Sequence, residues 1–257
     1  MSKKSSAIIK MKDSAEDLRV HKEDLFDLPM RLLVIGRSQL SGKTNLVGNL
    51  MLRPYGKEDD HIGQQLYRYD FRGNNIYIVC PSTVVDDKWQ AIIDGKKIPD
   101  GNIYHSYDED ELDALYDRLS EQYDREKAEG KKPEQKLVIM DDVSWSGDLK
   151  GKLHGVINKF ACNGRHRLIS WIITSQKLSD VATTLRENMT GAIIYSCSQK
   201  QLELFYNDVG MCPKTEFCKA FREVTNKRHT FMVINYSNPH DKMFMDSDFN
   251  PIPSLSK

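Results

Sequence analysis

Apolar residues gather in short runs along this chain, and polar or charged stretches separate the runs. Runs typical of strands cover 31–35, 75–80, 103–106, 136–142, 168–174, 191–197 and 230–236. Apolar residues at helical spacing lie between them, most clearly at 109–128, where Leu112, Leu115 and Leu119 recur on a charged background. Further helices are predicted at 43–52, 86–93, up to about 162, 199–208 and 213–222.

Strands that alternate with helices predict an α/β protein with a mostly parallel central sheet and helices on both faces. The strand runs lack polar alternation, which fits strands buried on both faces. We expect an N-terminal arm at 1–30, one domain at 31–236 and an irregular C-terminal tail at 237–257. The stretches 53–74 and 198–229 are expected to be insertions within that domain.

A glycine-rich loop, GRSQLSGKT (36–44), joins the first strand to the first helix. Backbone N–H groups of such a loop and the positive end of the helix bind phosphate oxygens. Lys43 would reach the β- and γ-phosphates and the Thr44 hydroxyl would bind Mg²⁺, so the loop predicts ATP with Mg²⁺. The residues expected to hold the nucleotide are Gly36, Ser38, Ser41, Gly42, Lys43, Thr44 and Asn45.

The spacing of this loop departs from the common form. Five residues separate Gly36 from Gly42 where four are usual, and Arg37 stands in the place of the usual first glycine. The loop is therefore expected either to be one residue longer or to turn one step early, at Gly36.

Two later strands end in polar residues that suit hydrolysis. The run LVIMDD places Asp141, a predicted Mg²⁺ ligand, beside Asp142, which would orient and polarise the attacking water. The run LISWIITSQ ends in Gln176, where ATPases of the additional-strand type place a residue that faces the γ-phosphate. Arg165, Arg167 and Arg186 are the arginines that could neutralise transition-state charge, and Arg165 and Arg186 rank equally. In some NTPases a neighbouring subunit supplies such an arginine, and the sequence does not indicate which of these would do so.

Together these segments resemble a known family. VIGRSQLSGKTNL, IYIVCPST with Trp89 nearby, KLVIMDD, NGRHRLISWIITSQ and LRENMTGAIIY are similar to the genome-packaging ATPases of large DNA viruses and virophages. This poxvirus-type group belongs to the FtsK–HerA class of P-loop motors, and the resemblance covers 31–197. It implies a RecA-like P-loop fold of the additional-strand type. It also matches Lys43, Thr44, Asp141, Asp142 and Gln176 to the family's site, with Arg165 in its GRH stretch.

The resemblance also implies partners and a location. The family's members hydrolyse ATP to move double-stranded DNA into a capsid, as a ring of roughly five or six identical subunits at a capsid or portal vertex. That role implies the cytoplasm of an infected host cell or the virion. Two other functions stay open. A P-loop kinase would carry an arginine-rich lid, which this sequence does not show, and a virion assembly protein would bind the nucleotide without pumping DNA.

Composition adds limits to this prediction. Thirty-seven basic and thirty-seven acidic residues give a net charge of zero, so charge alone does not favour nucleic acid. Local basic stretches that would meet DNA phosphates are Lys3, Lys4, Lys10, Lys12, Lys150, Lys152, Lys159, Arg165, His166 and Arg167, although solvated surface is the commoner role. No apolar run reaches the roughly 18 residues of a membrane span, and no secretory signal is evident. Five scattered cysteines predict reduced thiols in an intracellular compartment.

Overall fold

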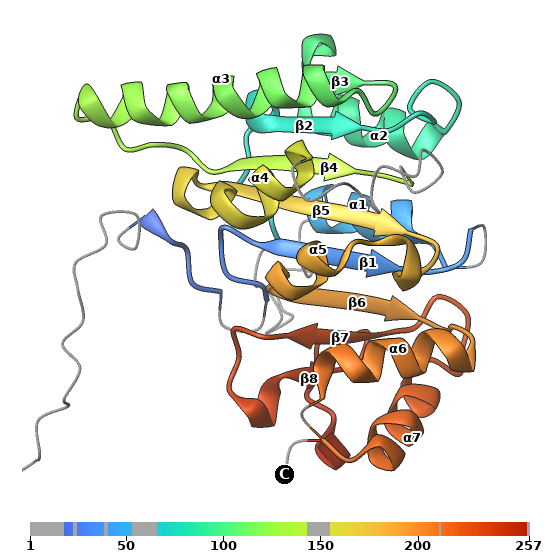
Figure 1. Ribbon diagram of the computed structural model, residues 1–257. Helices are drawn as coiled ribbons and strands as arrows, with labels where there is room; N and C mark the ends of the chain where they lie inside the picture. The colour runs from blue at the N-terminus through green and yellow to red at the C-terminus, as the bar shows by residue number, and fades with distance from the viewer. Residues whose placement is uncertain are drawn as a thin grey trace, which may run out of the picture.

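One eight-stranded sheet organises the computed structural model, in the order β3-β2-β4-β5-β1-β6-β7-β8 (Figure 1). The structure describes residues 18–22, 25–38, 41–52, 66–142, 155–210 and 212–255. The first six strands in this order, from β3 across the sheet to β6, pair in parallel. Strand β7 runs antiparallel to β6, and β8 runs antiparallel to β7. The strands are β1 (Arg31–Ile35), β2 (Ile76–Val79), β3 (Ile103–Tyr104), β4 (Lys136–Met140), β5 (Ile169–Ser175), β6 (Gly191–Tyr195), β7 (Phe231–Asn235) and β8 (Phe244–Met245).

Helices cover both faces of this sheet, as the sequence predicts. Buried side chains of α1 and α2 belong to one hydrophobic core, and those of α3 to α7 belong to a second core on the opposite face. Within the described residues, no helix has the length and apolar character needed to cross a bilayer. The helices are α1 (Lys43–Leu52), α2 (Asp87–Lys96), α3 (Glu109–Ala128), α4 (Val156–Asn163), α5 (Thr183–Asn188), α6 (Gln199–Val209) and α7 (Lys214–Val224).

Strand β1 shows why the strand sequences are apolar throughout. Leu32 and Val34 belong to the core beneath α1, while Leu33 and Ile35 belong to the other core. Successive side chains of a strand point to opposite faces, so a central strand with helices on both sides buries every position. The continuous runs in the sequence are therefore the signature of a two-sided core.

The strand order positions the chemistry. Strand β5 lies between β4 and β1, with Ile35 beside Ser175 and Met140 beside Ile173. This order confirms the fold predicted for the additional-strand class, in which one strand separates the phosphate-loop strand from the acidic strand. Because the three strands are parallel, the residues that follow them meet at one edge of the sheet.

The two terminal segments contribute more structure than their polar composition indicates. In the predicted arm, Val20 pairs with Leu28, and Phe26 is only 1% exposed. A Cβ atom on Gly191 would lie 2.1 Å from the Phe26 ring, so that ring packs directly on the backbone of β6. In the segment expected to be irregular, β8 extends the sheet, since the short apolar run around Phe244 is buried.

Candidate functional site

The phosphate loop turns tightly directly after β1. The backbone N–H of Gly36 donates to the carbonyl of Ser175 at 3.0 Å, which continues the pairing of β1 with β5. The carbonyl of Arg37 then accepts from Ser41 twice, from the backbone N–H at 3.3 Å and from Oγ at 2.7 Å. These two hydrogen bonds hold Arg37 and Ser41 together across the loop. Positions 39–40 lie outside the described residues.

Two glycines have different reasons for being glycine. A Cβ atom on Gly36 would lie 2.6 Å from the Ser41 Cβ and 2.9 Å from the Tyr195 ring, so a side chain there has no room. Gly42 has a φ of +86°, a conformation that residues with a Cβ rarely adopt. Gly36 is therefore required by space, and Gly42 by its backbone conformation.

Lys43 sits inside this turn. Its Nζ donates to the Gly36 carbonyl at 2.9 Å, and the residue is only 8% exposed. Burial lowers the pKa of Lys43, and the nearby charges of Asp142 and Asp141 oppose that shift. The ammonium group is therefore held against the loop that would carry phosphates, on a carbonyl that a stronger acceptor can replace. Beside it, Ser41 is buried and Thr44 is half-buried, whereas Ser38 and Asn45 are exposed.

Asp141 is fixed at the end of β4 by three neighbouring elements. Thr174 Oγ1 donates to Oδ1 at 2.5 Å, and Trp89 Nε1 donates to Oδ2 at 3.1 Å. Cys80 Sγ also approaches Oδ2, at 3.6 Å. Burial raises the pKa of Asp141, and the hydrogen bonds from Thr174 and Trp89 oppose this rise. Burial, followed by the charge of Asp141, raises the pKa of the Cys80 thiol to about 12.

Asp142 and Gln176 face each other across the ends of β4 and β5. Gln176 Nε2 lies 3.2 Å from Oδ1 and 3.0 Å from Oδ2 of Asp142, so the amide spans the carboxylate. The backbone N–H of Asp142 donates to Thr174 Oγ1 at 3.1 Å. Asp142 has a φ of +50°, which is uncommon for a residue with a side chain. Thr174 thereby links both aspartates.

A polar cavity of about 220 Å³ connects these parts. Lys43 and Thr44 line one side of it, and Asp141 and Asp142 line another. Sequence reasoning missed three further lining residues, Ser82, Asp86 and Lys88. Their signal was present, because they follow β2, the neighbour of β4 in the parallel sheet, and therefore lie at the same edge.

The two arginines predicted to act on the nucleotide both lie outside this cavity. Arg186 of α5 forms an ion pair with Asp208, and its side chain is 11% exposed. Arg165 lies before β5, at the opposite end of that strand from Gln176. A seven-residue strand is roughly 20 Å long, so Arg165 lies about that far from the phosphate loop of its own chain.

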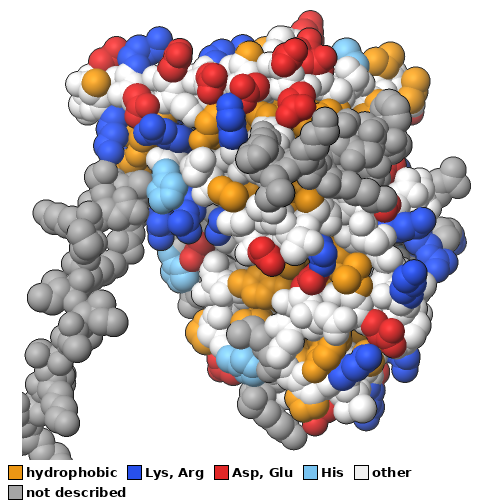
Figure 2. Space-filling model, in the orientation of Figure 1, with side chains coloured by type: hydrophobic (Ala, Val, Ile, Leu, Met, Phe, Trp, Pro, Cys, Tyr) orange, Lys and Arg blue, Asp and Glu red, His pale blue; other side chains and the backbone are white. Residues whose placement is uncertain are grey.

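Arg165 belongs to a cluster of positive charge at the amino ends of the strands. Figure 2 shows Lys, Arg and His side chains gathered over the beginning of β5. Arg165 is exposed, and its Nε donates to His166 at 3.2 Å. Burial lowers the pKa of the adjacent Arg31, and the charge of Arg165 lowers it further. In the described part of the chain, no acidic side chain is hydrogen-bonded to Arg165.

The residues suggested for DNA contact are only partly described. The N-terminal lysines, Lys150 and Lys152 lie outside the described residues. Lys159 pairs with Asp113, and Arg167 pairs with Asp124 at 2.5 Å. These two pairs join α4 and the turn before β5 to α3.

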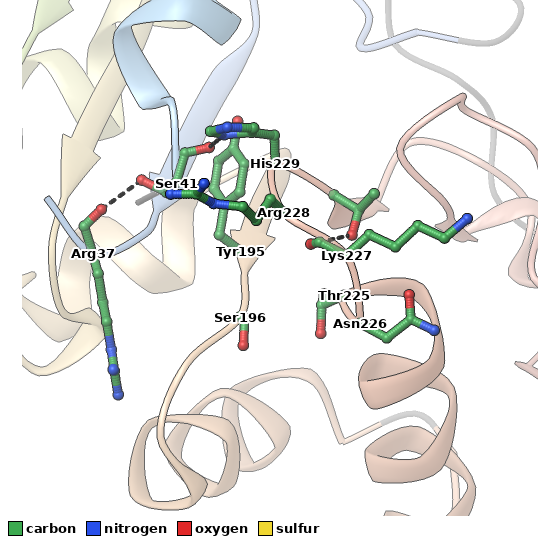
Figure 3. A pocket seen from close by; sticks show the side chains of 10 residues that line it. Arg37, Ser41, Tyr195, Ser196, Thr225, Asn226, Lys227, Arg228 and His229 are labelled. Atoms are coloured by element: carbon green, nitrogen blue, oxygen red, sulfur yellow. Dashed lines mark hydrogen bonds between the residues drawn. The ribbon is translucent and has the colours of Figure 1, made fainter. Parts of the chain in front are cut away.

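A second hollow lies on the other side of the phosphate loop, towards β6 and β7. The segment 225–230 reaches across β6, and His229 Nδ1 lies 3.3 Å from the Ser41 carbonyl. Figure 3 shows His229 close to Ser41, with Tyr195 beside them and Lys227 extending away. Sequence reasoning did not single out these residues, since nothing local connects position 229 with the loop at 36–44.

Comparisons with known proteins identify the family of this chain and structures that share its fold. The family model described as Poxvirus A32 protein matches residues 17–248. Structures of the genome packaging NTPase B204 from Sulfolobus turreted icosahedral virus 2 share the fold. The complex with AMP has a TM-score of 0.57 at 14% identity, and the complex with ATP-gammaS has 0.53 at 14%; each covers 87% of this chain and 98% of B204. A comparison with curated proteins found no match.

Proposed function

This chain belongs to the poxvirus A32 protein family, and we propose that it is an ATP-driven motor that packages double-stranded viral DNA as a ring of identical subunits. The family match confirms the resemblance to packaging ATPases predicted from the sequence. The likeness to B204 confirms the P-loop fold. We place the protein in the cytoplasm of the infected cell or in the virion, where its five free thiols would stay reduced.

The observation that carries the proposal is the pairing of Asp142 with Gln176 beside the phosphate loop. The Gln176 amide donates to both oxygens of Asp142, so the carboxylate is held in the wall of the cavity that Lys43 and Thr44 also line. Transfer of a phosphoryl group to water needs an acceptor that holds the water opposite the leaving group. Asp142 would take that role, and Gln176 would fix its direction.

The cavity also suits a magnesium ion. Among the described residues, no group of three or more His, Cys, Asp or Glu side chains is arranged to hold a metal alone. Mg²⁺ in such sites is held by one or two protein groups, by nucleotide oxygens and by water, which fits Thr44 and Asp141 on the cavity wall. The bound ion would neutralise charge on the phosphate oxygens. Both Asp141 oxygens already accept hydrogen bonds, so a contact through water suits this residue.

The protein side chains divide the work of hydrolysis. Lys43 would exchange the Gly36 carbonyl for phosphate oxygens, which are stronger acceptors for an ammonium group. Asp142 would accept a hydrogen bond from the attacking water and then its proton. Thr174 binds both the Asp141 carboxylate and the Asp142 backbone, so it would keep the two acids in register.

Of the two candidate arginines, we assign the charge-neutralising role to Arg165. Arg186 is already paired with Asp208 within its own chain. Arg165 is exposed in a positive cluster at the far end of β5, so it would reach the nucleotide of a neighbouring subunit and not its own. This assignment makes the ring part of the active site. The same positive surface would also attract DNA phosphates without reading sequence.

The decisive experiment is an ATPase assay with and without double-stranded DNA, run together with a measurement of oligomeric mass. A ring whose turnover rises with DNA is the expected result. Phosphate transfer to a nucleotide by a monomer would instead favour the kinase reading. Nucleotide binding without hydrolysis, even with DNA at high protein concentration, would favour an assembly protein.

A further inference from the structure

A groove of about 200 Å³ runs along α1 on the side of the phosphate loop away from Asp141. It shares Ser41 and Gly42 with the polar cavity, so the two hollows meet at the loop. Its other walls come from α1, from β6 and β7, and from the C-terminal turn at 246–250. The lining residues used below are Asn49, Tyr195, Phe231 and Phe249.

The direction of a nucleotide on the phosphate loop indicates which hollow would hold its base. The terminal phosphate belongs beside Asp142 and Gln176, because the water that attacks it must meet Asp142. The nucleoside must therefore leave the loop at its opposite end. That end is the groove, which begins at Gly42 and passes Asn45 and Asn49 on α1.

The groove has aromatic lining residues, which the described lining of the polar cavity lacks and which a nucleobase can stack on. The rings of Tyr195 and Phe231 pack edge to face at 5.2 Å between centroids, and Phe249 is partly buried against the same core. Aromatic side chains stack on nucleobases, whichever base is present. Asn49 Nδ2 donates to the Asn45 carbonyl at 2.9 Å, which leaves the amide oxygen of Asn49 as an acceptor suited to the exocyclic amine of adenine.

Phe249 lies in a turn that is held by the Asp246 side chain and by backbone hydrogen bonds, without a contribution from the Phe249 ring. The Asp246 carboxylate accepts from the backbone N–H groups of Asp248 and Asn250 at 2.9 and 3.0 Å. The backbone N–H of Phe249 donates to the Asp246 carbonyl at 3.1 Å, and Met245 pairs with Pro251. Replacing the ring should therefore leave the turn in place.

The neighbouring hollow of about 310 Å³ suits a base less well. It shares Ser41, Tyr195 and His229 with the groove, but Arg37, Lys227 and Arg228 give it a cationic lining (Figure 3). It also lacks the residues of α1 that follow the phosphate loop. The charges of this hollow suit phosphate oxygens, whereas the groove offers an aromatic ring and an amide oxygen beside the α1 residues that follow the phosphate loop, so the groove suits the base better.

We propose that the C-terminal turn forms one wall of an adenine-binding groove, with Phe249 stacking on the base and Asn49 accepting from its amine. This inference rests on the proposed function, because it requires that a nucleotide binds the phosphate loop. It assigns a ligand contact to a residue just beyond the segment 17–248 that the family model matches.

Titration calorimetry with two probes tests the groove. Mg-ATP carries the base and ribose, whereas Mg-tripolyphosphate carries only the phosphates. Loss of a stacked ring in Phe249→Ala should weaken ATP binding about tenfold and leave tripolyphosphate binding unchanged. Asn49→Ala should reduce the preference for ATP over GTP. Asn226→Ala, in the cationic hollow, is the matched control and should bind both probes like the wild type.

Equal ATP affinity in Phe249→Ala and the wild type would overturn the groove, as would a loss confined to Asn226→Ala. Phe249→Leu keeps apolar contact with the core but has no ring, so it serves if the alanine variant unfolds, and it should show the same selective loss. The two proposals can fail separately.

If Phe249→Ala binds ATP like the wild type and DNA still stimulates turnover, only the adenine-groove proposal is refuted. If Phe249→Ala loses affinity for ATP but not for tripolyphosphate, and DNA does not stimulate turnover by the wild type, only the motor proposal is refuted.

Discussion

The two edges of the parallel sheet carry opposite kinds of chemistry. At the carboxyl edge, Gln176 donates to Asp142, and Thr174 links Asp142 to Asp141 by hydrogen bonds. The two acids line the same cavity as the buried Lys43. At the amino edge, Arg165 is exposed among other positive side chains and has no acidic hydrogen-bond partner among the described residues. The acidic groups of the carboxyl edge have hydrogen-bond partners within the chain, whereas the guanidinium group of Arg165 at the amino edge is exposed to solvent.

This difference separates what one subunit does from what needs a second. In the proposed function, the carboxyl edge contains the groups that would bind phosphates and orient water, all within one chain. The charge of Arg165 at the amino edge lies about 20 Å along β5 from the phosphate loop of its own chain, so under this proposal it would act on a neighbour's nucleotide. Changes at the carboxyl edge should therefore act in every subunit, whereas changes at the amino edge should act only between subunits.

The sharpest test of the comparison is Arg165→Ala. If Arg165 completes a neighbour's site, turnover per subunit in the assembled ring should fall about 1,000-fold, since arginines supplied in this way stabilise transition-state charge. Steady-state ATPase assays check this. Mixing with Lys43→Met subunits should restore part of the activity, because those subunits still supply Arg165.

Arg186→Ala is the control for this experiment. Arg186 pairs with Asp208, so its loss should lower the melting temperature and spare turnover. Unchanged turnover in the Arg165→Ala ring would refute the proposed role of the amino edge in a neighbour's active site.

Asp142→Asn tests the carboxyl edge directly. The amide keeps the size of the side chain but cannot take a proton from water, so turnover should fall on the order of 10²-fold or more while ATP binding persists. Single-turnover hydrolysis measures the chemical step. Asp142→Glu restores the carboxylate and should recover part of the rate. Wild-type hydrolysis by the asparagine variant would refute the assignment.

Lys43→Met should weaken Mg-ATP binding about 50-fold, because it removes a charged donor to the phosphates and keeps the buried volume. Calorimetry measures the affinity, and thermal unfolding checks that the buried site still folds. Tripolyphosphate should lose affinity to a similar extent, in contrast to the selective loss expected for Phe249→Ala. Tight ATP binding by the methionine variant would contradict the phosphate loop assignment.

Gly36→Ala probes the backbone of the same edge. The new Cβ atom would lie 2.6 Å from the Ser41 Cβ, so the loop must move, and ATP affinity should fall about tenfold. Gly101→Ala is a matched control, since no atom lies within 4 Å of its added Cβ. Equal affinity in both variants would show that the loop tolerates the displacement.

Trp89→Phe should have the smallest effect. It removes the donor to Asp141 Oδ2 and should lower the free energy of unfolding by about 1.5 kcal/mol. Trp171→Phe is the control. Trp171 is equally buried, but its Nε1 has no hydrogen-bond partner within the described structure, so only packing changes. Denaturant unfolding compares the two. A smaller loss for Trp89→Phe than for Trp171→Phe would show that this hydrogen bond adds no stability.

Much of the fold was predictable because its signals are local. The strand at 31–35 and the helices at 43–52 and 109–128 have the bounds that the sequence predicts. Helix α5 and strand β8 were missed, since six residues and two residues are too short to show a period. The functional roles of the site residues and the domain boundaries stay predictions.

The sequence by itself determined the phosphate loop, the acidic strand end and the glutamine that follows β5, because each is a short motif attached to a strand. Only the tertiary structure decided what surrounds them. Trp89 reaches Asp141 and His229 reaches the loop from distant segments, and Phe249 lines the groove beside the loop. No local pattern encodes these placements. The separation of Arg165 from its own site has the same origin. Strand order sets which side chains share an edge, and it becomes fixed only when the strands pair.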